Sequence, residues 1–132
     1  MVDLSFIEIG DRINKIIIPK FDFVIGIATG GIVPASLIAY KLGVELNTIK
    51  INYRDDENHP RYENPKLLDD KSIKISGKKI LIVDDVSVSG KTLDSAKNIF
   101  HGNDITTLVL KGKADIVLFP EIASCVNWPW KI

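Results

Sequence analysis

The chain has 132 residues, and its 17 Lys and Arg balance its 17 Asp and Glu, so its formal net charge is zero. That length suits a single domain, the neutral charge argues against a nucleic-acid partner, and the short apolar runs exclude a membrane span of ~20 residues. Because Cys125 is the only cysteine, no intramolecular disulfide can form, and we expect a cytoplasmic protein without a membrane partner.

The first half of the chain predicts two helices and two strands. Ser5 can cap a first helix whose apolar residues follow a helical period. The nearly continuous apolar run at 21–28 predicts a strand that is buried on both faces. After a glycine-rich break, the pattern predicts a helix at 32–42 and a second strand at 44–53.

A long polar segment at 54–70 separates the two halves and is broken by Pro60 and Pro65. Segments of this kind in compact domains are usually lids, binding loops or disordered. Beyond it, the hydrophobic pattern predicts several further elements. In chain order these are a short strand at 72–75, a central strand at 80–83, a helix at 91–100, strands at 105–110 and 116–119, and an aromatic tail at 127–130.

Strands and helices alternate along the sequence, which predicts an α/β fold with a mainly parallel sheet flanked by helices. We assign residues 1–132 to one such domain. In parallel sheets, ligands bind beyond the carboxyl ends of the strands. Three unusual segments fall at such ends, namely 29–31, the loop after Tyr53 and 84–92, so we expect them to meet in one site.

The stretch at 79–93 carries the strongest functional signal. Its apolar strand reaches two adjacent carboxylates, Asp84 and Asp85, and a loop of small and hydroxyl residues then opens into a helix. Backbone N–H groups at a helix start lack partners and bind anions, so we expect a phosphate at 87–92. The carboxylates would repel that phosphate unless sugar hydroxyls or Mg²⁺ lie between them. The pattern therefore indicates a ribose phosphate.

Three other interpretations of this stretch are weaker. A Walker A phosphate loop needs a glycine five positions before Gly90, where this chain has Asp85. A response-regulator receiver domain needs three more strand–helix units, but only 47 residues follow Asp85. A plain helix-capping loop would leave two aspartates without partners at the end of a buried strand, which is costly.

The motif VDDVSVSGKT at 83–92 resembles the phosphoribosyl-pyrophosphate (PRPP) motif of type I phosphoribosyltransferases. The segment at 26–35 resembles the pyrophosphate loop of that family, and 54–70 stands where the family keeps its flexible catalytic loop. Within the family, Val33-Pro34, the short length and the Pro129-Trp130 ending are most similar to xanthine-guanine phosphoribosyltransferases. The resemblance implies the fold of that family, with a small C-terminal hood.

The resemblance also implies transfer of ribose 5-phosphate from PRPP to a purine base of the xanthine, guanine or hypoxanthine type. The products would be a nucleoside 5′-monophosphate and pyrophosphate, with Mg²⁺ as cofactor and a homo-oligomer as the expected assembly. Asp84 and Asp85 would be catalytic residues and metal ligands that hold the ribose hydroxyls. The other implied PRPP contacts are Ser87, Val88, Ser89, Gly90, Lys91 and Thr92 for the 5′-phosphate, Thr29, Gly30 and Gly31 for pyrophosphate, and Tyr53, Arg54 and Arg61 in the closing loop.

On the base side, the resemblance implies that Lys111 reads the 6-oxo group and that the carbonyl of Val126 contacts the base edge. Cys125 falls where a tryptophan stacks on the purine in that branch. Trp128 is the candidate to stack on the base in its place, from a shifted position. Each assignment has a structural alternative. Lys111 also fits a solvated turn lysine, and Trp128 with Trp130 also fits the packing of a C-terminal tail.

Three positions depart from the pattern of this branch. Val88 replaces the usual aspartate that exchanges a proton with N7 of the base, Thr29 replaces a basic residue, and Cys125 replaces the stacking tryptophan. These departures motivate an alternative, which is a PRPP- or nucleotide-binding regulatory protein with little or no turnover. A transferase for a different base is a third interpretation.

Overall fold

The computed structural model describes residues 1–52, 66–67 and 75–131. The predicted loop residues Tyr53, Arg54 and Arg61 lie outside the described residues, as does most of the predicted strand at 72–75. No helix in the described ranges is long and apolar enough to cross a membrane. The elements in chain order are β1 (Val2–Asp3), α1 (Phe6–Lys15), β2 (Phe23–Ala28), α2 (Ile32–Leu42), β3 (Glu45–Asn52), β4 (Lys66–Leu67), β5 (Lys79–Ser87), α3 (Lys91–Ile99), β6 (Asp104–Gly112), β7 (Ile116–Val117) and β8 (Val126–Asn127).

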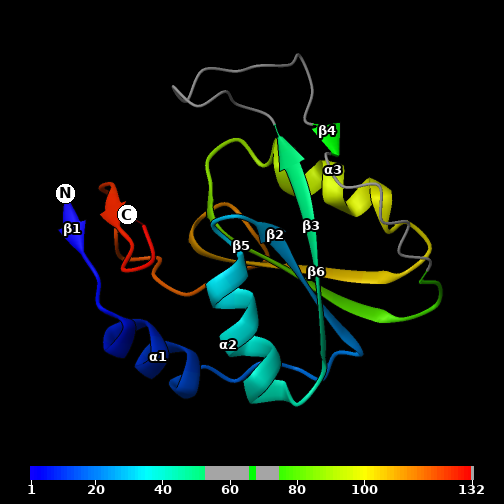
Figure 1. Ribbon diagram of the computed structural model, residues 1–132, viewed down its shortest axis with the longest axis horizontal. Helices are drawn as coiled ribbons and strands as arrows, with labels where there is room; N and C mark the ends of the chain where they lie inside the picture. The colour runs from blue at the N-terminus through cyan, green and yellow to red at the C-terminus, as the bar shows by residue number, and fades with distance from the viewer. Residues whose placement is uncertain (53–65, 68–74, 132) are drawn as a thin grey trace.

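Within the described part of the chain, a six-stranded sheet with the order β4-β3-β2-β5-β6-β7 forms the centre of the fold (Figure 1). Neighbouring strands are parallel except for β3 and β4, which run antiparallel. This confirms the predicted α/β fold with a mainly parallel sheet flanked by helices. Because β2 and β5 are neighbours, the turns that follow them leave the same edge of the sheet, where such folds bind ligands.

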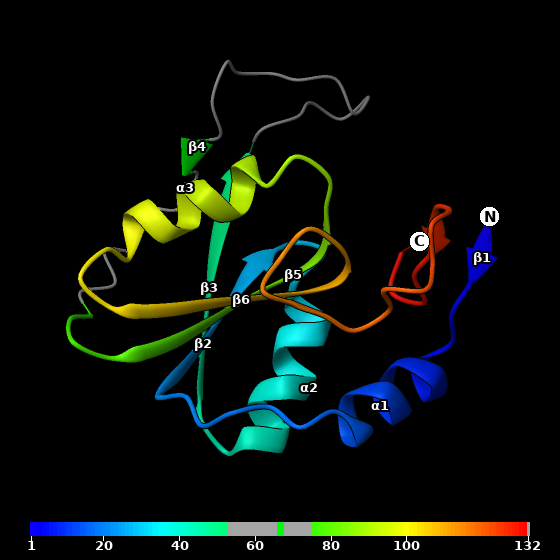
Figure 2. The same ribbon diagram turned by 180° about the vertical axis from the view of Figure 1, so that it is seen from behind.

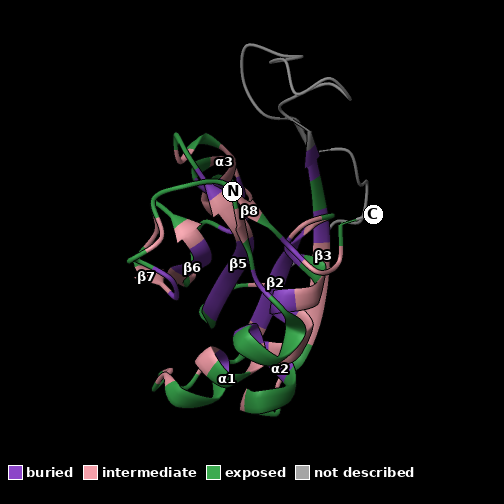
Figure 3. Ribbon diagram, turned by 90° about the vertical axis from the view of Figure 1, so that its left-hand side faces the viewer, coloured by how far each residue is buried: buried purple, intermediate pink, exposed green. Residues whose placement is uncertain are grey.

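Helices cover both faces of this sheet. α1 and α2 lie on one face and α3 lies on the other, as Figures 2 and 3 show. Each interface has its own apolar cluster, one with Ile13, Ile38 and Leu81 and the other with Ile82 and Leu93. Successive side chains of a strand point to opposite faces, so Leu81 and Ile82 enter different clusters. The apolar residues of β5 therefore pack against the helices on both faces of the sheet.

Polar contacts set the two ends of α1. Ser5 and Glu8 form a capping box, in which Ser5 Oγ accepts from the Glu8 backbone N–H at 3.1 Å and Glu8 accepts from the Ser5 N–H at 3.3 Å. At the other end, Lys41 of α2 donates to the carbonyls of Ile13 and Ile16 at 2.6 Å each. A cation at a helix C-terminus is stabilising. The predicted cap at Ser5 is confirmed, and Lys41 ties α1 to α2.

The central strand is longer than predicted. The hydrophobic pattern places its end at 83, but β5 continues through both aspartates to Ser87. It does so because β6 is also longer than predicted and pairs with β5 as far as Gly112. The two carboxylates therefore lie within a strand rather than beyond one. Lys111 likewise lies in β6, and the interpretation of this residue as part of a turn is wrong.

Residues 118–131 form a small C-terminal hood beside the carboxyl end of the sheet. Its strand β8 pairs in parallel with β1, so the two ends of the described chain lie together (Figure 1). β1, β4 and β8 have two residues each, which is too short for a periodic signal, and the hydrophobic pattern misses all three. β7 is shorter than the strand predicted at 116–119.

Arg12 of α1 fastens the start of the hood. Its guanidinium donates to the carbonyl of Leu118 and to both carboxylate oxygens of Glu121, at 3.1 and 2.7 Å for the latter. The same group lies 4.2 Å from the ring centroid of Phe119. The hydrogen bonds from Arg12 lower the pKa of Glu121 to about 2. The hood is therefore attached to α1 at one end and to β1 at the other.

Candidate active site

The turn after β2 brings two glycines against β5. Gly31 is buried, and a Cβ atom at its position would lie 2.6 Å from two backbone carbonyl oxygens. A Cβ atom at Gly30 would lie 2.6 Å from Cγ of Asp85. The peptide bond between Ala28 and Thr29 is cis, and Thr29 is exposed. Because only glycine permits this close approach, the turn packs directly on the Asp85 carboxylate.

Asp84 and Asp85 are adjacent but lie in different environments. Asp84 is 9% exposed, whereas Asp85 is half-buried. Each carboxylate accepts a hydrogen bond of 2.8 Å from the backbone N–H of the following residue. Burial, followed by the negative charge of Asp85, raises the pKa of Asp84 well above its usual range. Asp85 is therefore the carboxylate that is more accessible to a ligand.

This pair of carboxylates fits a Mg²⁺ ion that is shared with a ligand. The two groups repel each other, and a divalent cation would offset that repulsion. Within the described ranges, no three His, Cys, Asp or Glu side chains gather into a fuller metal site. Mg²⁺ typically uses one or two carboxylates and completes its shell with waters and phosphate oxygens. Asp84 and Asp85 match that requirement.

The loop between β5 and α3 has the geometry of an anion site. Gly90 precedes α3 in the left-handed region, with φ of 84°. Ser89 Oγ accepts a hydrogen bond from the Lys91 backbone N–H at 3.3 Å. The first N–H groups of a helix lack intrahelical partners, and the helix dipole is positive there. Ser87 differs from the rest of the predicted loop, because it is buried in β5 and its carbonyl accepts from the Lys113 N–H at 2.9 Å.

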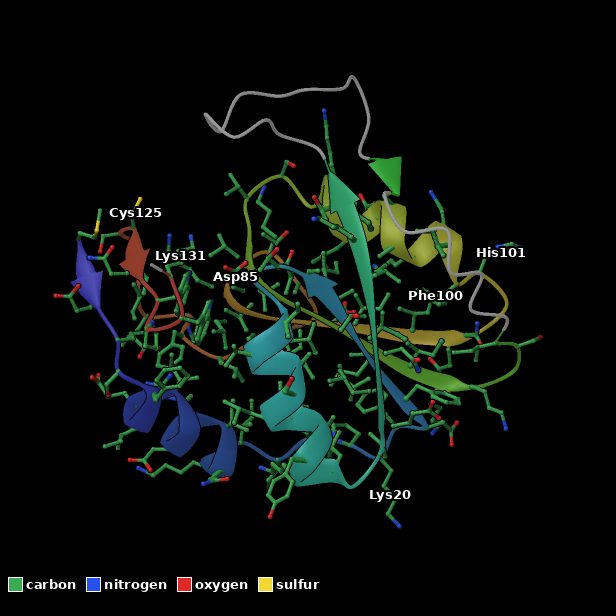
Figure 4. All side chains as sticks on the ribbon, in the orientation of Figure 1. Lys20, Asp85, Phe100, His101, Cys125 and Lys131 are labelled. Atoms are coloured by element: carbon green, nitrogen blue, oxygen red, sulfur yellow. The ribbon has the colours of Figure 1, made fainter. Side chains whose placement is uncertain are left out.

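A cavity of about 450 Å³ lies between the end of the sheet and the hood. Figure 4 shows Asp85 on the sheet and Cys125 on the hood at this same end of the molecule. Val88, which is 73% exposed, contributes an apolar wall. The cavity brings together predicted residues from three separate segments, which are Asp85, Val88, Lys111, Cys125, Val126 and Trp128.

The pairing of β8 directs the backbone of Val126 away from β1. The carbonyls of Cys125 and Asn127 accept from the N–H groups of Val2 and Leu4, at 2.9 and 3.4 Å. Successive carbonyls of a strand point to opposite sides, so the Val126 carbonyl faces away from β1. Val126 lines the cavity, and its carbonyl takes no part in the pairing with β1.

Trp128 lines the cavity, but Trp130 covers one face of its ring. Trp128 is 3% exposed, and the two rings stack in parallel with centroids 5.5 Å apart. Trp130 also contacts Phe6 of α1, at a centroid distance of 6.1 Å. The tail packing given as the structural alternative for both tryptophans is therefore present. Only the part of Trp128 that reaches the cavity wall can meet a ligand.

A second cavity, of about 410 Å³, shares Val86, Val88 and Lys111 with the first. It extends toward the start of the hood and is not lined by Asp85 or Val126. It therefore lacks the two residues that the sequence analysis assigns to the ribose and to the base edge. The first cavity is the better candidate for the reacting groups.

Lys131 also lines the first cavity, and sequence reasoning misses it. A lysine near the end of an aromatic tail has no spacing or neighbouring motif that separates it from a solvated lysine. Its position becomes apparent only when the hood folds back over the carboxyl end of the sheet.

Comparison with known proteins gives one family for most of the chain. Residues 5–110 match the sequence profile described as the phosphoribosyl transferase domain. Orotate phosphoribosyltransferase of Sulfurisphaera tokodaii is 36% identical over 105 residues, which cover 77% of this chain and 49% of that protein. Transcriptional regulator GfcR of Archaeoglobus fulgidus is 31% identical over 102 residues, which cover 76% of this chain and 51% of the regulator. The chain thus spans about half the length of these curated relatives.

A solved structure shares the fold over almost the whole chain. Purine phosphoribosyltransferase from Pyrococcus horikoshii superposes with a TM-score of 0.81 at 24% identity, covering 99% of this chain and 94% of that chain. At this identity the likeness shows the fold alone. The family profile ends at residue 110, so the family match covers the carboxylates and the phosphate loop but not the residues at the base end of the cavity.

Proposed function

Since the chain belongs to the phosphoribosyl transferase domain family, we propose that it is a PRPP-dependent phosphoribosyltransferase that acts on a purine base. It would convert a base of the xanthine, guanine or hypoxanthine type into its nucleoside 5′-monophosphate and release pyrophosphate. One observation carries the proposal: Asp85 from β5, Lys111 from β6 and Val126 from the hood line the same cavity. A sugar and a base must be held together in this way for the new bond to form.

In this proposal, PRPP binds across the carboxyl ends of β2 and β5. The N–H groups at the start of α3 and the hydroxyls of Ser89 and Thr92 donate to the 5′-phosphate. Asp85 accepts from the ribose hydroxyls. In the turn, the N–H groups of Thr29 and Gly30 donate to pyrophosphate, because the Gly31 N–H already donates to the Ile27 carbonyl at 2.8 Å. Asp84 and Asp85 would hold Mg²⁺, which when bound offsets the negative charge of the leaving group.

The chain itself contributes fixed dipoles and a protected site. N–H donors held by a turn and a helix start need no reorganisation as charge grows on pyrophosphate. The half-buried Asp85 carboxylate lies beside the ribose, where positive charge develops. Tyr53, Arg54 and Arg61 would close over the reacting centre and exclude water, and because they lie outside the described residues their role stays a prediction.

The test is a base panel. The protein is incubated with PRPP, Mg²⁺ and each of xanthine, guanine, hypoxanthine, adenine, orotate and uracil, and nucleotide and pyrophosphate are measured by chromatography. We expect both products in equal amounts with at least one oxopurine. Orotate belongs in the panel because a curated relative carries that name. Absence of product with every base would contradict the proposed activity.

A regulatory protein without turnover is the second candidate. It is favoured by Val88, an apolar residue on the wall where an acid–base group would be useful, and by the similarity to a transcriptional regulator. Calorimetry with PRPP and with nucleoside monophosphates separates the two candidates. Tight nucleotide binding together with no product in the base panel would favour the regulator.

Two wider expectations accompany the proposal. We place the activity in the cytoplasm, which suits a chain whose only cysteine, Cys125, is a free and exposed thiol. The homo-oligomer implied by the family resemblance stays a prediction, and light scattering of the purified protein would test it.

A further inference from the structure

Lys131 occupies a fixed position at the base end of the cavity. Its backbone N–H donates to the carbonyl of Trp128 at 3.1 Å. Trp128 is in turn held by its stack on Trp130 and by the pairing of the preceding strand β8 with β1. The backbone that carries Lys131 is therefore ordered by several contacts, and its side chain lines the cavity. Figure 4 shows Lys131 on the same side of the molecule as Asp85.

Two lysines line this cavity, Lys111 and Lys131. Across residues 1–52, 66–67 and 75–131, neither ammonium forms a hydrogen bond or an ion pair. Asp85 is the one acidic residue of the described chain that lines the cavity, and the proposed function commits it to the ribose. Among the described residues, no other acidic group lines the cavity to pair with the two lysines, so a base in the cavity would meet two positively charged donors.

The polar groups of the cavity wall differ in whether they donate or accept hydrogen bonds, and this difference favours one kind of ligand edge. A lysine ammonium only donates, and the backbone carbonyl of Val126 only accepts. These three residues of the wall thus offer two donors and one acceptor. The complementary edge of a ligand has two acceptors and one donor, which is the pattern of an imide, O=C–NH–C=O.

We propose that Lys131 is a second base-reading residue and that, with Lys111 and Val126, it selects bases that carry an imide edge. The inference rests on the proposed function and narrows its substrate class. Lys111 and Lys131 each donate to one oxo group, and the Val126 carbonyl accepts the imide N–H. Xanthine, uracil and orotate carry this edge, whereas hypoxanthine, guanine and adenine do not.

The selection among purine bases depends on whether the group at position 2 of the base can accept a hydrogen bond from Lys131. Hypoxanthine lacks the 2-oxo group of xanthine and leaves the Lys131 ammonium without its acceptor. Guanine places a 2-amino group there, so a donor would face a donor. Loss of one hydrogen bond to a charged group corresponds to about tenfold or more in affinity. Xanthine against hypoxanthine is therefore the sharpest pair for a test, since along the proposed imide edge the two bases differ only at C2.

The experiment compares the wild type with Lys131→Met, and Lys20→Met serves as the matched control. Lys20 is an exposed lysine at the far end of the molecule from the hood, as Figure 4 shows, so its substitution removes the same charge away from the site. Two readouts are taken, kcat/KM for xanthine and hypoxanthine and the dissociation constants of the corresponding monophosphates, XMP and IMP. Because Lys131 is exposed, we expect the variant to fold, and a thermal melt checks this.

We expect the wild type to prefer xanthine over hypoxanthine, and XMP over IMP, by about tenfold or more. Lys131→Met should bring both ratios close to one by weakening xanthine and XMP alone. Lys131→Arg should retain the preference, and Lys20→Met should leave it unchanged. A Lys111→Met variant should weaken both purines together, because both carry the 6-oxo group.

The other outcomes distinguish a failure of the proposed role of Lys131 from a failure of the proposed function. Equal use of xanthine and hypoxanthine by the wild type, with no change in Lys131→Met, overturns the inference and leaves the proposed function intact. Preference for orotate or uracil supports the imide edge on a pyrimidine and overturns the purine part of the proposed function. Absence of product with every base overturns the proposed activity, and the XMP-to-IMP binding ratio then still decides the role of Lys131.

Discussion

The two halves of the candidate site are built in different ways. The PRPP half, residues 29–31 and 84–92, comes from two neighbouring strands and the turns that directly follow them. The base half, Lys111 and residues 125–131, depends on a hood that is held in place from the other end of the chain. The first half is a local backbone arrangement, and the second is assembled from distant contacts.

This difference predicts two kinds of response to substitution. At Gly30 and Gly31 in the PRPP half, the backbone approaches its neighbours so closely that one added atom has no space. In the base half, several separate contacts hold the hood in place. The loss of one contact leaves the others intact. Changes in the PRPP half should therefore be large and should act on PRPP, while changes in the base half should be smaller and should act on the base.

Asp85→Asn gives the largest expected effect. The substitution keeps the shape of the side chain and its acceptor for the Val86 N–H, but removes the charge beside the ribose and Mg²⁺. We expect kcat/KM for PRPP to fall by about 10²–10³-fold, as for loss of one preorganised electrostatic group. Steady-state kinetics at varied PRPP and varied Mg²⁺ measure this. Asp104→Asn, at an exposed position at the start of β6, is the control, and unchanged PRPP affinity in Asp85→Asn would refute the ribose role.

Gly30→Ala should follow, with a smaller loss. The added methyl would meet the Asp85 carboxylate, so either the turn or the carboxylate must shift. Overpacking of this kind costs about 1–3 kcal/mol, which corresponds to about 5–150-fold in PRPP affinity. Gly10→Ala is the matched control, since a Cβ atom there meets nothing within 4 Å and alanine favours the helix. If both variants bind PRPP like the wild type, the close packing of the turn on Asp85 has no functional role.

The sequence predicts most of the local structure of the PRPP half, for a physical reason. A strand, a turn with small or hydroxyl residues and a helix start are local patterns, and each leaves its signal in neighbouring residues. The positions of Asp85, Ser89 and Gly90 follow from such patterns. What the pattern misses is the length of β5, because its last residues are held by pairing with β6 rather than by their own hydrophobicity.

The base half is less predictable because its contacts join the two ends of the chain. The pairing of β1 with β8 involves two residues on each side and has no periodic signal. Arg12 and Glu121 are ordinary charged residues in the sequence until the fold brings them together. Lys131 shows the same limit, since nothing near it in the sequence indicates a cavity. The family profile, which ends at residue 110, does not reach it either.

Asp3→Ala tests whether the β1 strand supports the base half. The Asp3 carboxylate accepts from the side-chain amide of Asn127 at 2.8 Å, next to Val126. Loss of one such hydrogen bond costs about 0.5–1.5 kcal/mol, so we expect KM for the base to rise by about 2–10-fold. KM for PRPP should stay unchanged, and Asp11→Ala, an exposed acid on α1, should alter neither value. A rise in KM for PRPP that matches the rise for the base would mean that the two halves are not independent.

Glu121→Gln gives the smallest expected effect, and the effect depends on pH. The pKa of Glu121 is lowered from 4.5 to about 2 by the hydrogen bonds from Arg12. A carboxylate with a lowered folded-state pKa stabilises the protein fully above its unfolded pKa, and this stabilisation disappears as the pH falls through the folded value. The melting temperature of the wild type should therefore exceed that of Glu121→Gln near pH 7, and the gap should narrow between pH 4.5 and about 2.

Thermal melts of both proteins across that range measure the gap, with Glu45→Gln as the control. Glu45 is exposed and forms no ion pair with any described residue, so we expect its variant to show no comparable change with pH. A gap between the wild type and Glu121→Gln that stays constant from pH 7 to 2 would mean that the Arg12 contact is not what links this carboxylate to folding. A gap that closes as expected, together with a slight rise in KM for the base and none for PRPP, would show that even this exposed pair supports only the base half of the site.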